Sequence, residues 1–202
     1  MSTFAILRLV VIKGRVDVPA IAESLGLSVE QVTETTTALT TEGHLKQTPM
    51  GLRATPQGRE HAVTLVQQES AAVDTAAVEQ VYAEFCSLNS DFKALITDWQ
   101  LREGTPNDHG DAAYDAAVLD RLRKLHAEAL PLVERVGTLA ERLSVYPQRL
   151  ERALQRVDAG DMTYIARPVL DSYHTVWFEL HEDLIGLAGL TRADEAAAGR
   201  GA

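Results

Sequence analysis

The chain contains a single cysteine, Cys86, among its 202 residues. One thiol cannot form an internal disulfide, so the fold must rely on packing, and this cysteine usage fits a reducing compartment. Aromatic residues make up only 5% of the chain, whereas hydrophobic residues as a whole reach 46%. Because alanine and leucine are abundant and both favour helix, we expect a mainly α protein.

Long apolar runs and a secretory leader are missing as well. The apolar stretch from Phe4 to Ile12 is far too short to cross a bilayer. The first residues show no positively charged segment followed by an apolar region and a small-residue cleavage site. We therefore expect a cytoplasmic protein with no membrane partner.

Signatures of catalysis are also missing. The sequence has no glycine-rich phosphate loop, no nucleophile elbow and no CxxC pair. Cys86 follows Phe85 within a helical pattern, where a packed, inert thiol is the ordinary expectation. We find no nucleophile paired with a base, so we expect that the protein is not an enzyme.

The clearest pattern lies in the first third of the chain. Gly26 ends a short apolar helix that begins near Pro19, and Ser28 begins the next helix. Gln31 follows Ser28 by three residues, which is the spacing of a capping box. Two short helices joined by a glycine-containing turn are typical of a helix-turn-helix.

A hairpin and a further helix complete this unit. Residues 45–48 and 52–55 alternate in polarity around Pro49-Met-Gly51, which predicts a β-hairpin. Thr55-Pro56 then supplies an N-cap followed by proline at the first helical position. The sequence therefore predicts a winged helix-turn-helix domain over residues 1–61, made of three helices and a β-hairpin wing.

This order of elements resembles the winged-helix domain of MarR-like bacterial regulators. The resemblance covers residues 4 to about 61 and implies a DNA-binding transcriptional regulator with double-stranded DNA as its partner. Winged helices also serve as protein–protein modules, so the resemblance alone leaves both uses open.

In such a regulator, the outward face of the helix that begins at Ser28 and the hairpin would contact the DNA. A 3.6-residue period with Val32, Thr36 and Leu39 turned inward places glutamate and threonine outward. Glutamate, glutamine and threonine can read bases, whereas lysine and arginine bind phosphates. The candidate DNA-binding residues are Ser28, Glu30, Gln31, Thr33, Glu34, Thr37, Lys46, Arg53 and Arg59.

Charge is distributed unevenly along the chain. The net charge is −10, which opposes approach to a polyanion. Residues 1–61 hold six basic and six acidic side chains, so the entire excess lies in residues 62–202. A neutral DNA-binding domain attached to an acidic remainder of the chain predicts modest DNA affinity with a strong salt dependence.

Residues 62–202 are predicted to form helices throughout. Apolar residues recur at spacings of three and four from Val78 to Trp99 and again from Val118 to Leu143. This pattern fits an antiparallel helical bundle within one chain. Because winged-helix readers usually bind DNA as two-fold dimers, we also expect part of the helical surface to form a homodimer.

The end of the chain is predicted from its prolines and glycines. A short helix stops at Gly160, and Pro168 is expected to open the last long helix. The tail from Thr191 to Ala202 is rich in alanine and glycine, and we expect it to fray.

A polar stripe beside aromatic residues suggests a site in the bundle. The candidate effector-pocket residues are Trp99, Asp108, His109, Arg167, Asp171, Tyr173, His174, Trp177 and His181. Three interpretations remain open: a satisfied buried hydrogen-bond network, a pocket for a small-molecule effector, and a transition-metal site. The metal candidates are His109, His174 and His181, but their spacing lacks the i, i+4 pattern of a strong signal, so no cofactor is firmly predicted.

Several segments carry a second resemblance. Four segments resemble a helical region of actinobacterial proteins, namely Asp98-Trp-Gln, Asn107-Asp-His, Asp111-Ala-Ala-Tyr-Asp115 and the run from Asp171 to Leu184. That region accompanies phosphoenolpyruvate-utilising enzymes, including pyruvate phosphate dikinase-like proteins. The chain has neither an ATP-grasp nor a phosphohistidine domain, so no catalytic residue carries over. The resemblance implies an alternative function, a non-DNA-binding accessory or regulatory protein whose winged helix contacts protein.

Overall fold

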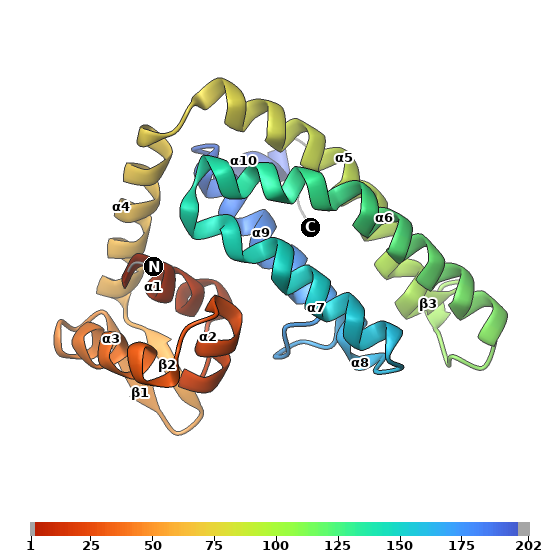
Figure 1. Cartoon of the computed structure of the whole chain (residues 1–202), viewed down its shortest axis with the longest axis horizontal. Coiled ribbons are helices and arrows are strands. Elements are labelled where there is room, and N and C mark those ends of the chain that lie inside the picture. The colour runs from red at the N-terminus through yellow and green to blue at the C-terminus, as the bar shows by residue number, and fades with distance from the viewer. Residues whose placement is uncertain (1–2, 198–202) are drawn as a thin grey trace.

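The computed structural model describes residues 3–197. Helices make up most of this part of the chain, and its strands form two short antiparallel hairpins. The predicted mainly α class is therefore confirmed. In Figure 1 the N-terminal elements gather at the lower left, and the later helices form the rest of the molecule.

The N-terminal unit contains three helices, a hairpin and a longer helix. These elements are α1 (Thr3–Lys13), α2 (Val18–Leu25), α3 (Val29–Thr41), β1 (Leu45–Thr48), β2 (Gly51–Ala54) and α4 (Pro56–Ala72). The hairpin pairs Leu45 with Ala54 and Lys46 with Arg53. Leu45, Leu52 and Ala54 are buried in the core that α1, α2 and α3 share.

Local hydrogen bonds explain where these helices begin and end. Gly26 ends α2 with a φ of 64°, a left-handed conformation that glycine adopts without strain. Ser28 and Gln31 form both halves of the predicted capping box at the start of α3. Thr55 caps α4 by accepting a hydrogen bond from the backbone N–H of Gly58. The cap signals in the sequence therefore predicted these boundaries correctly.

Gly58 also lets α4 approach the hairpin closely. A Cβ atom at this position would lie 2.0 Å from the backbone oxygen of His44. Only a residue without a side chain fits such a contact, so Gly58 fixes how α4 leaves the hairpin.

The remaining helices pack around a second core. The long helices are α5 (Thr75–Gln100), α6 (Ala112–Leu139), α7 (Tyr146–Asp158) and α9 (Tyr173–Leu187). The shorter elements are β3 (Leu101–Arg102), β4 (Thr105–Pro106), the 3₁₀ helix η1 (Glu141–Val145), α8 (Thr163–Ala166) and α10 (Arg192–Ala197). Figure 1 shows α5 and α6 running together, with the β3–β4 hairpin at their far end. Pro131 lies within α6 and does not interrupt it.

The apolar stripe of α5 is used inside the chain. Phe85, Phe92 and Trp99 are buried in the same core as residues of α6 and α9. Intrachain packing therefore explains the heptad pattern, and the stripe does not require a second copy of the chain.

Two predicted boundaries differ from the structure. Residue 61, the expected end of the first domain, lies inside α4, which packs against both α1 and α9. The last long helix was expected to begin at Pro168, but α9 begins at Tyr173 because Ser172 accepts a hydrogen bond from the Thr175 N–H. Asp171 thus lies before α9 and does not share its histidine face.

The expected frayed tail is partly helical. Thr191 and Asp194 cap α10 through reciprocal hydrogen bonds. Glu195 is fully buried, so residues 192–197 are held against the bundle. The rest of the predicted tail, residues 198–202, lies outside the described residues.

Candidate functional site

The candidate base-reading residues lie together on the outward face of α3. All six residues of this set are exposed, namely Ser28, Glu30, Gln31, Thr33, Glu34 and Thr37. Four of them already have hydrogen bonds within the helix. Ser28 and Gln31 form the capping box, and the hydroxyls of Thr33 and Thr37 donate to Val29 O and Thr33 O, each at 2.7 Å.

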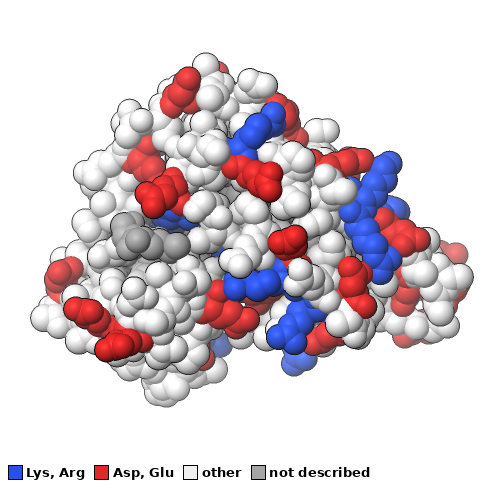
Figure 2. All heavy atoms as spheres, viewed as in Figure 1, with Lys and Arg blue, Asp and Glu red and all other residues white. Residues whose placement is uncertain are grey.

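The charge of this face comes from glutamate. Glu30 and Glu34 lie on α3, and the helix contains no lysine or arginine. Figure 2 shows acidic side chains and no basic ones over the visible part of α3. Phosphate contacts by α3 would therefore depend on its backbone and hydroxyl groups.

Positive charge is concentrated instead on the β1–β2 hairpin. Lys46 and Arg53 are both exposed and lie directly opposite each other in the strand register. Directly opposed residues of an antiparallel pair share a face, and like charges placed this way are destabilising. The pair has no evident role in folding, whereas an anion bound between the two side chains would relieve their repulsion.

Arg59 extends this basic region. Its guanidinium Nη1 donates to Ala54 O at 3.0 Å, which holds the side chain near the end of β2. Arg15, which the sequence analysis did not select, contacts the Met50 sulfur at the hairpin turn. The hairpin thus gathers four exposed cations from three separate segments.

The three histidines considered for a metal site lie against three different aromatic residues of α5. The ring centroids of His181 and Phe85 are 5.3 Å apart, those of His174 and Phe92 5.9 Å apart, and those of His109 and Trp99 4.3 Å apart. Those aromatic residues are seven positions apart, which corresponds to about 10 Å along a helix.

The structure therefore does not bring these three histidines together at one point. Within residues 3–197 no group of three histidine, cysteine or carboxylate residues is placed to hold a metal ion. The equal spacing of seven residues along α5 and α9 keeps His174 and His181 apart, and His109 lies in the loop before α6.

The aromatic candidates for pocket walls belong to the core. Tyr173 and Trp177 are 0% and 2% exposed, and the Trp177 and Phe85 rings stack at 5.0 Å. The indole N–H of Trp177 donates to Asn89 Oδ1 at 3.0 Å, so its polar atom is satisfied. Burial raises the pKa of Tyr173 and lowers the pKa of His174. These residues pack against neighbours instead of lining a cavity.

The other pocket candidates lie elsewhere. Arg167 is exposed at the end of α8, and Asp108 is exposed in the loop before α6, where it accepts from the Gly110 N–H. His109 lies in that same loop, and its Nδ1 is 3.0 Å from Oδ2 of Asp115 in the first turn of α6. The structure thus distributes the predicted effector residues over both ends of the bundle.

Asp171 belongs to a network of buried and half-buried charges that sequence reasoning missed. We call this network the ionic junction, and it comprises Arg8, Lys13, Glu69, Arg142, Arg149, Asp171, Glu179 and Asp183. It lies between the two hydrophobic cores and contains four cations and four anions. The balance of charges makes its burial tolerable.

One half of the ionic junction centres on Asp171 and Glu179. Lys13 Nζ lies 2.7 Å from a carboxylate oxygen of each, and Arg149 contacts them at 3.0 and 2.6 Å. Ser24 of α2 donates to Asp171 at 2.9 Å. Burial alone would raise the pKa of Asp171, but the ion pairs with Arg149 and Lys13 hold it well below its usual value.

The other half centres on Asp183. Arg8 and Arg142 contact its two oxygens at 2.8 and 2.7 Å, and the Tyr146 hydroxyl donates to it at 2.6 Å. Burial would raise the pKa of Asp183, but the two arginines lower it. Arg142 also pairs with Glu69 of α4, so this half ties α1, α4, η1 and α9 together.

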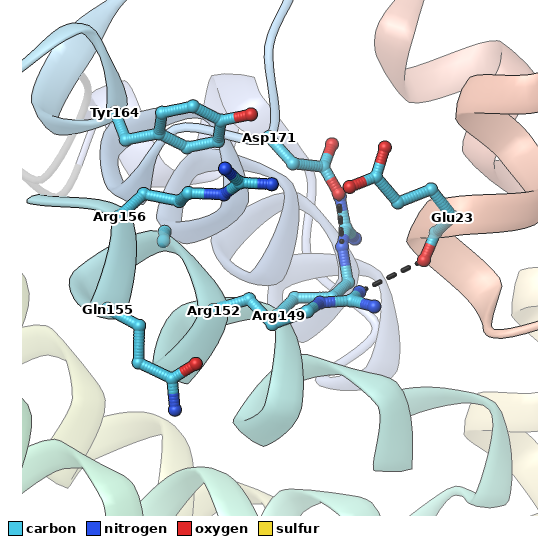
Figure 3. A pocket seen from close by; sticks show the side chains of 8 residues that line it. Glu23, Arg149, Arg152, Gln155, Arg156, Tyr164 and Asp171 are labelled. Atoms are coloured by element: carbon cyan, nitrogen blue, oxygen red, sulfur yellow. Dashed lines mark hydrogen bonds and ion pairs between the residues drawn. The ribbon is translucent and has the colours of Figure 1, made fainter. Parts of the chain in front are cut away.

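A polar pocket opens beside the first half of the ionic junction. Its volume is about 310 Å³, and residues of α2, α7, α8 and the segment before α9 line it. Figure 3 shows Arg156 and Tyr164 on one side, Glu23 on the opposite side, and Arg152 reaching toward the Glu23 backbone. Of the predicted effector residues, Asp171 alone lines this pocket.

Comparisons with known proteins add no further constraint. No family model matches the chain, and no curated protein or solved structure matches it either. Across residues 3–197, each helix is too short or too polar to traverse a lipid bilayer.

Proposed function

We propose that the protein is a DNA-binding transcriptional regulator whose N-terminal unit is a winged helix-turn-helix with the β1–β2 hairpin as its wing. The observation that carries this proposal is the opposed pair Lys46 and Arg53 on an exposed strand face. A pair of cations that disfavours the free hairpin suits a surface that binds phosphates. Arg15 and Arg59 widen the same surface.

In this proposal α3 enters the major groove and contributes little affinity of its own. Glu30 and Glu34 can accept hydrogen bonds from cytosine, and threonine methyl groups can contact thymine methyls. The negative charges of Glu30 and Glu34 repel the DNA phosphates, so the hairpin supplies most of the attraction to DNA. Binding should consequently weaken steeply as salt is added.

The homodimer remains part of the proposal because helix-turn-helix proteins pair on two half-sites. Its interface must lie outside the α5 stripe, which packs within the chain. We likewise propose a cytoplasmic location and a small-molecule effector, which would bind in the pocket beside the ionic junction.

A second candidate function is favoured by the acidic face of α3. A helix that carries Glu30 and Glu34, no cation and largely engaged hydroxyls also suits contact with a basic protein surface. This is the accessory role, in which the unit binds a phosphoenolpyruvate-utilising type of enzyme and no DNA.

Selection of bound fragments from random double-stranded DNA separates the two candidates. The regulator predicts enrichment of a two-fold symmetric motif by the full chain. The accessory role predicts instead that the full chain enriches no motif at low salt. It also predicts that the full chain captures a protein partner from a lysate and that an E30K/E34K variant no longer does. A variant with exposed glutamates changed on α6, E128K/E134K, is the matched control.

A further inference from the structure

The pocket beside the ionic junction carries two arginines that have no carboxylate partner within residues 3–197. Arg152 Nη2 donates to the backbone oxygen of Glu23 at 3.0 Å, and the Arg156 guanidinium lies 5.6 Å from the centre of the Tyr164 ring. Arg149, one turn earlier on the same face of α7, differs because Asp171 and Glu179 neutralise it. The two remaining charges are oriented by neighbours that do not neutralise them.

The charges around this pocket leave a local positive excess. Lys13 and Arg149 balance Asp171 and Glu179 within the ionic junction. Glu23 and Asp171 are the acidic residues that line the pocket, and with Asp171 already paired in the ionic junction, Glu23 is the one left to offset Arg152 and Arg156. A pocket with this charge excess favours an anion, and the Glu23 carboxylate on its wall can accept hydrogen bonds from hydroxyl groups.

We propose that this pocket binds a small hydroxylated oxyanion, a phosphate monoester or carboxylate whose charged group lies between Arg152 and Arg156 and whose hydroxyls face Glu23. The cavity of about 310 Å³ lies at the small end of the range for ligand sites, which fits a compact metabolite. Tyr164 offers a flat wall for its carbon skeleton. Arginine forks are well suited to phosphate and carboxylate oxygens.

Ligand binding here would act on the helix-turn-helix. Arg152 holds the backbone of Glu23 near the end of α2, and the same guanidinium is needed for the anion. An occupied pocket therefore competes with the contact that secures α2 to α7. The effect on DNA rests on the proposed function, whereas the binding itself is a property of the protein alone.

The binding test uses glycerol 3-phosphate and glycerate, which share hydroxyls and differ in their anionic group. Amide and arginine side-chain signals of the ¹⁵N-labelled full chain are followed by NMR during titration without DNA. We expect saturable shifts in α2, α7 and α8 for at least one of the two ligands, and the tighter ligand identifies the anionic group.

Arginine variants make the test specific. R152Q and R156Q should each weaken binding at least about tenfold, because each removes a charge-assisted hydrogen bond. R135Q, an exposed arginine of α6, is the control and should bind as the unmodified chain does. The proposal is overturned if neither ligand shifts these signals up to about 10 mM. It is equally overturned if R152Q and R156Q, with their folded spectra intact, bind unchanged.

Discussion

Lys13 and Asp171 form an ion pair of 2.7 Å across 158 residues of sequence. Lys13 is the last residue of α1, and Asp171 precedes α9, so the pair joins the N-terminal unit to the helical bundle. The contact is largely shielded from water, with side-chain exposures of 9% and 19%. It makes the orientation of the N-terminal unit dependent on charges contributed by the bundle.

Removing Lys13 should therefore destabilise the whole chain. In K13M the Ser24 hydroxyl still donates to Asp171, but among the described residues Arg149 is the one cation left for both Asp171 and Glu179, so one negative charge lacks a counterion. We expect a loss of about 3 kcal/mol in the free energy of unfolding, measured by urea denaturation. K124M is the control, because Lys124 is exposed and its pair with Glu128 should contribute less than about 1 kcal/mol. Equal effects of the two variants would contradict this role for Lys13.

Acid should destabilise the protein in two stages. Burial lowers the pKa of His174 from 6.5, so protonation favours the unfolded chain and stability starts to fall below that pH. The ion pairs that lower the pKa of Asp171 and Asp183 from 3.8 add stability above that value, and this stability is lost as the pH falls through it. Urea denaturation between about pH 7.5 and 2 measures both stages. Burial also lowers the pKa of His126, so H174Q should reduce the first stage, H126Q/H174Q should remove it, and both variants should keep the second stage. An unchanged profile for the double variant would refute the assignment.

His181 should serve folding. Its ring packs against Phe85 at 5.3 Å, and its Nε2 lies 3.8 Å from a carboxylate oxygen of the fully buried Glu195. H181N should cost about 1–3 kcal/mol and lower the melting temperature by several degrees. A melting temperature equal to that of the unmodified chain, together with a lost ligand response, would restore His181 as a sensor residue.

Local signals explain why the start of the chain was predictable. Gly26, the Ser28–Gln31 pair and Thr55-Pro56 each act within four residues, and each ends or begins a helix as expected. The polar stripe of the last helix shows the limit of such local signals. A spacing of seven predicts a shared helix face, but it does not say that each ring packs on a different residue of α5.

No comparable signal in the sequence predicted the ionic junction or the pocket beside it. Lys13 and Arg149 sit on helices far apart in sequence, and nothing in their neighbourhoods identifies Asp171 as their common partner. The prediction instead placed Asp171 on the last helix beside His174. The Ser172 cap, which begins α9 two residues after Asp171, frees that carboxylate to face α1 and α7.

The most direct test of the proposed function is the salt dependence of DNA binding by a hairpin variant. Fluorescence anisotropy with one duplex at several salt concentrations compares the unmodified chain, K46A/R53A and the control R121A/R135A, which removes two exposed arginines from α6. We predict that K46A/R53A binds every sequence more weakly and that its slope of log affinity against log salt is flatter by about two units. The control should keep both the affinity and the slope of the unmodified chain. Unchanged binding by K46A/R53A, or an equal loss in the control, would contradict a DNA-binding hairpin.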